Sequence, residues 1–151
     1  REANNFALNE TKLISNGLGS LIGVVNVAGG VIGLFSILVG GFGIANIMFV
    51  SVKERTNIIG IQKALGAKNY FILFQFLFES MLLSIAGGII GLIIIFLLTL
   101  ALSAGLDMDI SLSLKNISLG IMISSIIGLI AGIAPALSAS RLDPVEAMRS
   151  K

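Results

Sequence analysis

The sequence predicts an all-α integral membrane protein with three transmembrane helices. Apolar residues make up 56% of its 151 residues and charged residues only 12%, against about 25% charged residues in a typical soluble domain. The few charges leave three long uncharged stretches, and a charge at the centre of a bilayer is costly. A soluble domain of this size could not hide so much apolar surface from water, so the bilayer is the natural solvent of this chain.

The first uncharged stretch is about twice as long as one membrane crossing requires. It holds forty residues, 13–52, between Lys12 and Lys53, whereas a transmembrane helix needs about 20. As one helix it would measure roughly 60 Å, against a hydrocarbon core of roughly 30 Å. We therefore place the first span at about 31–52 and interpret the more polar segment before it as a stalk or interfacial helix.

The second span is placed at about 80–102, in an uncharged stretch that begins after Glu79. The residues before Glu79 are rich in phenylalanine, and aromatic side chains gather at the membrane–water boundary. This aromatic segment is interpreted as the interfacial entrance to the second helix. Glu79 itself is a functional candidate because acids are rare in membrane segments, and we favour a structural or coupling role for it over proton translocation.

The third span is placed at about 117–137, inside an uncharged stretch at 116–140. Pro135 near its end indicates a kink or a stop. A short loop at about 103–116, which contains Asp107, Asp109 and Lys115, joins the second span to the third.

The distribution of Lys and Arg predicts the orientation, because cytoplasmic loops carry an excess of them. Seven fall on one side, namely Lys53, Arg55, Lys63, Lys68, Arg141, Arg149 and Lys151. Three fall on the other, namely Arg1, Lys12 and Lys115. We therefore expect residues 53–68 and the C-terminus in the cytoplasm, and the N-terminal segment and the 103–116 loop outside.

Small residues recur at helical spacing on every span, and such stripes let helices approach closely in lipid. The candidate packing positions are Gly29, Gly33, Gly87, Gly91, Gly128 and Gly132. We favour packing within this chain. The alternative is a seam between two copies, since three spans alone make a poor pore.

Residues 54–67 predict a short amphipathic helix at the cytoplasmic surface of the membrane. Ile58, Ile61 and Leu65 share one face at helical spacing. Gly66 is a typical helix stop, and Lys63 lies near the negative end of the helix dipole. The alternative is a basic loop that only fixes the topology.

A second short cytoplasmic helix is predicted to begin at Pro144. Asp143 suits the N-cap, Pro144 the first helical position, and Glu146 the third, as in a capping box. Arg141 stands just before this group. The alternative is an inert C-terminal tail.

Several classes of function are excluded by residues that the sequence lacks. It has no cysteine and no histidine, which removes disulfides, Cys/His zinc sites, thiol nucleophiles and Ser-His-Asp triads. It has no phosphate-binding Gly-x-x-x-x-Gly-Lys-Ser/Thr motif and no basic run typical of nucleic-acid binding. We expect a chain that is not an enzyme and binds no metal, cofactor or nucleic acid. Because it begins at Arg1, with no signal peptide, we expect part of a longer protein.

Three stretches together resemble the FtsX-like permease family, which includes MacB-type exporters and lipoprotein-releasing permeases. They are GGFGIANIM followed by VSVKERT at 40–56, IGIQKALGA at 59–67, and PA at 135–136 with RLDPVEAMR at 141–149. The resemblance covers residues 30–149. One departure is Ile59, where the family often has an acidic residue.

The resemblance implies the C-terminal transmembrane half of such a permease. Residues 1–30 would be the end of an extracytoplasmic region with its stalk, and 31–151 the transmembrane domain. The segment 54–67 would be a coupling helix that docks on an ATPase, with contacts from Glu54, Arg55, Thr56, Ile58, Gly60, Ile61, Lys63, Leu65 and Gly66. Arg141, Asp143, Pro144 and Glu146 would form a C-terminal cytoplasmic cap.

The implied function is the permease of an ABC-type transporter in the bacterial inner membrane, which exports or extracts a substrate by mechanotransmission. ATP and Mg would bind to the partner ATPase. Further expected partners are membrane lipid, a second permease chain as a homodimer or pair, and a periplasmic adaptor with an outer-membrane channel. One alternative is a signalling adaptor that transports nothing and activates an envelope enzyme such as a cell-wall hydrolase. Another is a small structural membrane protein without an ATPase.

Overall fold

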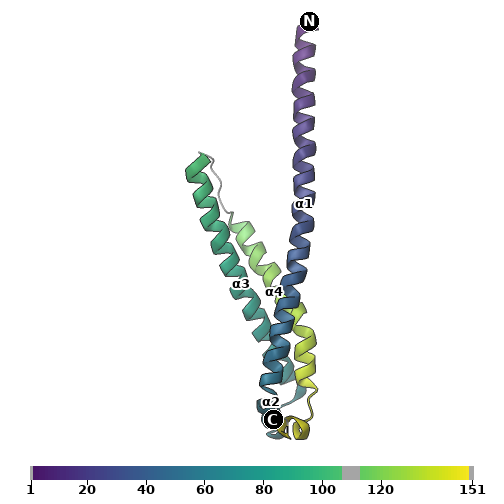
Figure 1. The fold of residues 1–151 in the computed structure, drawn as a ribbon, viewed down its shortest axis with the longest axis vertical. Coiled ribbons are helices and arrows are strands. Elements are labelled where there is room, and N and C mark those ends of the chain that lie inside the picture. The colour runs from purple at the N-terminus through teal and green to yellow at the C-terminus, as the bar shows by residue number, and fades with distance from the viewer. Residues whose placement is uncertain (1, 107–112, 150–151) are drawn as a thin grey trace. The chain divides into compact units, whose positions relative to one another are not determined.

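The computed structural model describes residues 2–106 and 113–149, with side chains at 15–104 and 113–148. Over these residues it contains only helices: α1 (Glu2–Glu54), α2 (Thr56–Ala64), α3 (Asn69–Leu106), α4 (Leu114–Ser140) and α5 (Pro144–Arg149) (Figure 1). Contacts divide the chain within α1 into two units, Arg1–Val39 and Gly40–Lys151. Arg1, Asp107, Asp109 and Lys151, which entered the predicted orientation and loop, lie outside the described residues.

Three of these helices are long and apolar enough to cross a membrane, at Ser15–Glu54, Asn69–Ala104 and Leu114–Ser140. The predicted spans fall inside them, so the all-α membrane fold is confirmed. Large apolar side chains along these helices are widely exposed, as Val24 and Leu97 illustrate. Lipid can surround such helices, because their backbone polar groups are hydrogen-bonded within each helix.

Helices α3 and α4 extend beyond the spans predicted for them. Helix α3 begins at Asn69, so the aromatic segment forms its first turns. Ile72 and Phe76, four residues apart, are buried, whereas Phe74 and Phe78 are exposed. Pro135 does not end α4, which continues to Ser140. A proline this close to a helix end removes one hydrogen bond but leaves the next turn able to form.

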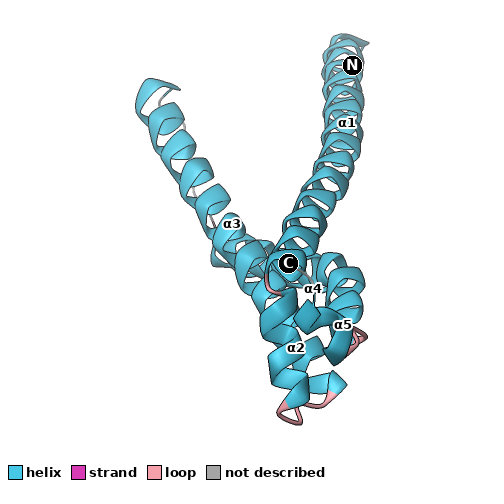
Figure 2. Cartoon of the chain, turned by 60° about the horizontal axis from the view of Figure 1, so that its bottom comes forward, coloured by secondary structure: helices cyan, strands magenta, loops and turns pink. Residues whose placement is uncertain are grey.

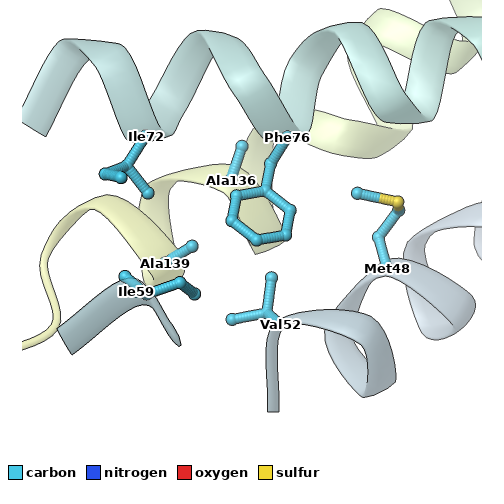
Figure 3. Close-up of a cluster of buried hydrophobic side chains, with 7 residues drawn as sticks. All are labelled: Met48, Val52, Ile59, Ile72, Phe76, Ala136 and Ala139. Carbon is cyan, nitrogen blue, oxygen red and sulfur yellow. The ribbon is translucent and has the colours of Figure 1, made fainter. Parts of the chain in front are cut away.

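One buried cluster lies where α2 joins the three long helices, within the unit Gly40–Lys151. Its members are Met48 and Val52 of α1, Ile59 of α2, Ile72 and Phe76 of α3, and Ala136 and Ala139 of α4. Figure 3 shows the Phe76 ring near the centre of this group, between Ala136 and Val52. The two alanines let the end of α4 approach closely, so one aromatic ring fills the space between three helices.

A seam of small residues joins α3 to α4. A Cβ added at Gly128 would lie 2.6 Å from Ser84 Cβ and 2.8 Å from the Ser80 backbone oxygen. The Ser84 hydroxyl donates a hydrogen bond of 2.6 Å to the Ser124 carbonyl of α4. Close backbone approach and interhelical hydrogen bonds are the means by which helices associate in lipid.

Among the predicted packing glycines, the structure places only some in a helix contact. Gly128 and Gly132 of α4 lie against α3. Added Cβ atoms at Gly29, Gly33, Gly87 and Gly91 would meet nothing within 4 Å. On α3, the seam passes through Gly88, whose added Cβ would meet the Ser124 side chain.

Candidate functional site

Helix α2 is joined to α1 by a single non-helical residue, Arg55. The Arg55 N–H still donates to the Ser51 carbonyl at 3.0 Å. The Thr56 hydroxyl lies 3.0 Å from the Val52 carbonyl and 2.9 Å from the Lys53 carbonyl, both in the last turn of α1. These carbonyls would otherwise lack helical partners. The turn between the two helices is therefore held by hydrogen bonds on both sides of Arg55.

Helix α2 has one buried side and one uncovered apolar side. Ile59 and Gly60 are buried, and Ile59, at the position where the family often has an acid, belongs to the core. Ile58, Ile61 and Leu65 are 55%, 46% and 84% exposed. The predicted apolar stripe thus stands uncovered in the part of the chain that the structure describes, while the opposite side anchors the helix.

Gly60 permits the contact between α2 and α5, which lie side by side in Figure 2. A Cβ added at Gly60 would lie 2.8 Å from Ala147 Cβ and 3.2 Å from the Met148 backbone nitrogen. Real Cβ atoms do not approach other atoms as closely as 2.8 Å, and the approach of 3.2 Å is tight and made to backbone. The glycine is therefore a requirement of the packing between these two helices.

Replacing Gly60 with alanine is expected to lower the free energy of unfolding of the α2–α5 contact by about 1–3 kcal/mol through overpacking. Faster hydrogen exchange of α5 amides in the detergent-solubilised protein measures this. Gly43→Ala is the control, because its added Cβ meets nothing within 4 Å. Equal exchange of α5 in the two variants would contradict the expected clash.

Lys63 points toward the end of α4. Its Nζ donates hydrogen bonds of 2.7 Å to the carbonyls of Ser140 and of Leu142. Arg141, which follows the last residue of α4, is exposed. A lysine 77 residues earlier in the chain supplies the positive charge that the helix C-terminus favours.

Glu79 of α3 faces the junction between α1 and α2. Its Oε2 lies 3.3 Å from Arg55 Nη1, and the two side chains are 33% and 49% exposed. Such partly exposed ion pairs contribute only about 0–1 kcal/mol. The pair therefore orients Arg55 toward α3 more than it stabilises the fold, and it lies in the region where a structural contact was expected.

The ends of both short helices follow local chemistry read from the sequence. Gly66 has a φ of 99°, and the amides of Gly66 and Ala67 donate to the carbonyls of Lys63 and Gln62. This pair of bonds is the Schellman arrangement that ends a helix. At α5, the Asp143 carboxylate accepts a hydrogen bond of 2.8 Å from the Val145 amide, and Pro144 takes the first helical position.

The remaining predicted contact residues lie around these helices. Glu54 and Glu146 are exposed, and Glu146 stands in the first turn of α5. Sequence reasoning missed Ala147, which is 2% exposed and faces Gly60. The DPVEAM pattern marked α5 as a helix, yet nothing local showed which of its faces would meet α2.

Comparison with known proteins identifies the family to which this chain is similar. Residues 30–144 match the family described as FtsX-like permease C-terminal. The chain is 42% identical over 136 residues to the Bacillus subtilis protein named uncharacterized ABC transporter permease YknZ, which covers 90% of this chain and 34% of that protein. It is 35% identical over 147 residues to the macrolide export ATP-binding/permease protein MacB of Rhodopirellula baltica, covering 97% of this chain and 22% of that protein. The chain spans about a third or less of these relatives.

Proposed function

Since the chain belongs to the FtsX-like permease family, we propose that it couples ATP hydrolysis on an ATPase to export or extraction of a substrate outside the membrane. The ATPase is a separate subunit or another domain of the same protein, since MacB relatives are named ATP-binding/permease proteins. This chain is the membrane-spanning, non-catalytic part. It lies in the bacterial inner membrane with α2 and α5 in the cytoplasm.

The uncovered side of α2 is the observation that carries this proposal. Ile58, Ile61 and Leu65 present an apolar stripe, while Ile59 is buried in the core on the opposite side. Apolar patches left on a protein surface are typical of interaction sites. Because this one belongs to a helix fixed to its neighbours, a partner that binds the stripe can move the helices behind it.

In the proposed mechanism the ATPase binds the stripe and shifts α2 when it closes on ATP. The shift reaches α1 through the hydrogen-bonded turn at Arg55. Helix α1 continues without a break in its secondary structure from Glu54 back to Glu2, which favours it as the element that carries motion outward. ATP and Mg bind on the ATPase, and the substrate is engaged outside the membrane.

Replacing Ile58 and Ile61 together with aspartate is expected to weaken ATPase binding at least about tenfold, because two charges would be desolvated in an apolar contact. Binding is measured with the full-length protein in detergent and its own ATPase. Leu114→Asp is the control, since Leu114 is 84% exposed but begins α4, away from α2. Unchanged affinity and unchanged ATPase stimulation in the double variant would refute the docking role of α2.

A mild-detergent pull-down of the full-length protein from its own membranes identifies the partners. We expect an ATPase, either as a second chain or within the same protein, together with an adaptor or outer-membrane channel. An ATPase with a cell-wall hydrolase or its activator would instead indicate the signalling adaptor. Absence of any ATPase after crosslinking at residues 54–67 would overturn the proposed function.

A further inference from the structure

We propose that Lys63 is a positioning residue that joins α2 to the end of α4, so that motion imposed on α2 reaches α4 and α5 as well as α1. This inference rests on the proposed function, because it assigns a second path to the same coupling step. It also gives Lys63 a role within the chain in place of the ATPase contact that the family resemblance implies.

The carbonyls at the end of α4 explain why a cation belongs there. The last four carbonyls of a helix have no partner within it. Those of Leu137, Ser138 and Ala139 accept hydrogen bonds from the backbone amides of residues 141 and 142. The Ser140 carbonyl receives its hydrogen bond from Lys63, which also binds the Leu142 carbonyl, each at 2.7 Å. One ammonium thus completes the end of α4 and holds the segment that leads into α5.

The Lys63 side chain does not belong to the apolar stripe of Ile58, Ile61 and Leu65. Its Nζ is hydrogen-bonded within the chain to two carbonyls, and the residue is half-buried. Hydrogen bonds made by a charged group are shorter and stronger than neutral ones. These carbonyls take two of the three donors of the ammonium, so an acidic group on the ATPase would have only the third donor unless Lys63 released a carbonyl.

Two further features link α2 to α4 and α5. Ile59, four residues before Lys63, packs in the same buried cluster as Ala136 and Ala139 of α4. Gly60 lies against Ala147 of α5. Helix α2 therefore shares a buried cluster with α4 in addition to the hydrogen bond from Lys63 to the Ser140 carbonyl, and a displacement of α2 disturbs both unless α4 moves with it.

Hydrogen exchange tests the contact itself without any ATPase. In the full-length protein, Lys63→Met is expected to raise the exchange rate of α5 amides on the order of tenfold, as the loss of charge-assisted hydrogen bonds requires. Lys63→Arg, which keeps the charge and several donors, is expected to restore slow exchange. Lys53→Met is the control, because Lys53 is an exposed lysine at the end of α1. Unchanged α5 exchange in Lys63→Met would overturn the proposed contact.

Environment-sensitive labels test the transmission. Single cysteines replace Ile130 of α4 and Phe42 of α1, which are 65% and 70% exposed, in a full-length protein freed of any other cysteines. When ATP and vanadate hold the ATPase in its closed state, the protein with native Lys63 is expected to show a change in the signal of the environment-sensitive label at both positions. Lys63→Met should lose the change at position 130 and keep it at position 42, and Lys63→Arg should keep both.

The outcomes separate the two proposals. A full response at position 130 in Lys63→Met would refute transmission through Lys63, while the docking of the ATPase on α2 would stand. No response at either label in the protein with native Lys63 would refute the proposed coupling function and the transmission with it. Loss of both responses in Lys63→Met would also refute a path specific to α4.

Discussion

Replacing Phe76 with alanine is expected to destabilise the protein by about 3–5 kcal/mol, the usual cost of removing a buried aromatic side chain. Phe76 is 1% exposed and lies in the cluster shared by α1, α2, α3 and α4. The space left by the ring cannot collapse easily, because α4 already approaches closely through Ala136 and Ala139. Denaturation of the detergent-solubilised protein by increasing SDS measures the loss.

Phe78→Ala is the matched control for this experiment. It removes the same ring from the same helix, but Phe78 is 58% exposed and faces lipid in the proposed membrane arrangement. Its substitution is expected to change stability by less than about 1 kcal/mol, as for other surface positions. If both variants unfold at the same SDS fraction, the buried cluster does not hold these helices together.

Replacing Gly128 with leucine is expected to cost about 3 kcal/mol or more, at the upper end of overpacking effects. The first added carbon would already lie 2.8 Å from the Ser80 backbone oxygen and 3.0 Å from Met81 Cα. Neither neighbour is the movable tip of a side chain, so α3 and α4 must separate. Separation also breaks the hydrogen bond from Ser84 to the Ser124 carbonyl. Loss of the monodisperse peak in size-exclusion chromatography after heating measures the effect.

Gly91→Leu is the control for the seam, because it makes the same change on α3 at a position where an added Cβ meets nothing within 4 Å. It should retain the thermal stability of the unsubstituted protein. Equal losses in the two leucine variants would show that the damage comes from losing a helical glycine in general and not from the contact between α3 and α4.

The sequence predicted well those features that depend on neighbouring residues. Three uncharged stretches gave the three long helices, because the cost of charge in lipid acts on each segment separately. Gly66 and Asp143 marked the ends of the short helices, since a cap is satisfied within a few residues of the chain. These features need no knowledge of how the helices meet.

Contacts between segments that are far apart in the sequence could not be predicted from such local patterns. The stripe on the second span includes Gly87, Gly88 and Gly91, and periodicity alone does not show that Gly88 faces Ser124. Lys63 gave no sign of its partners, because those are backbone carbonyls, which every residue possesses. Ile59 looked like an apolar departure from the family until the structure placed it in the core.

The hydrogen bonds from Lys63 to carbonyls 77 and 79 residues later also have a consequence for biosynthesis. At roughly 5–20 residues per second, a bacterial ribosome needs about 4–16 s to add those residues. During that interval residues 56–64 have been made, but Lys63 does not yet have both carbonyls to bind and α5, which packs against Gly60, is not complete. A chain interrupted in this interval lacks the Lys63 hydrogen bonds and the contact of Gly60 with α5, although α1 and the start of α3, which share the buried cluster with Ile59, precede α4 in the chain.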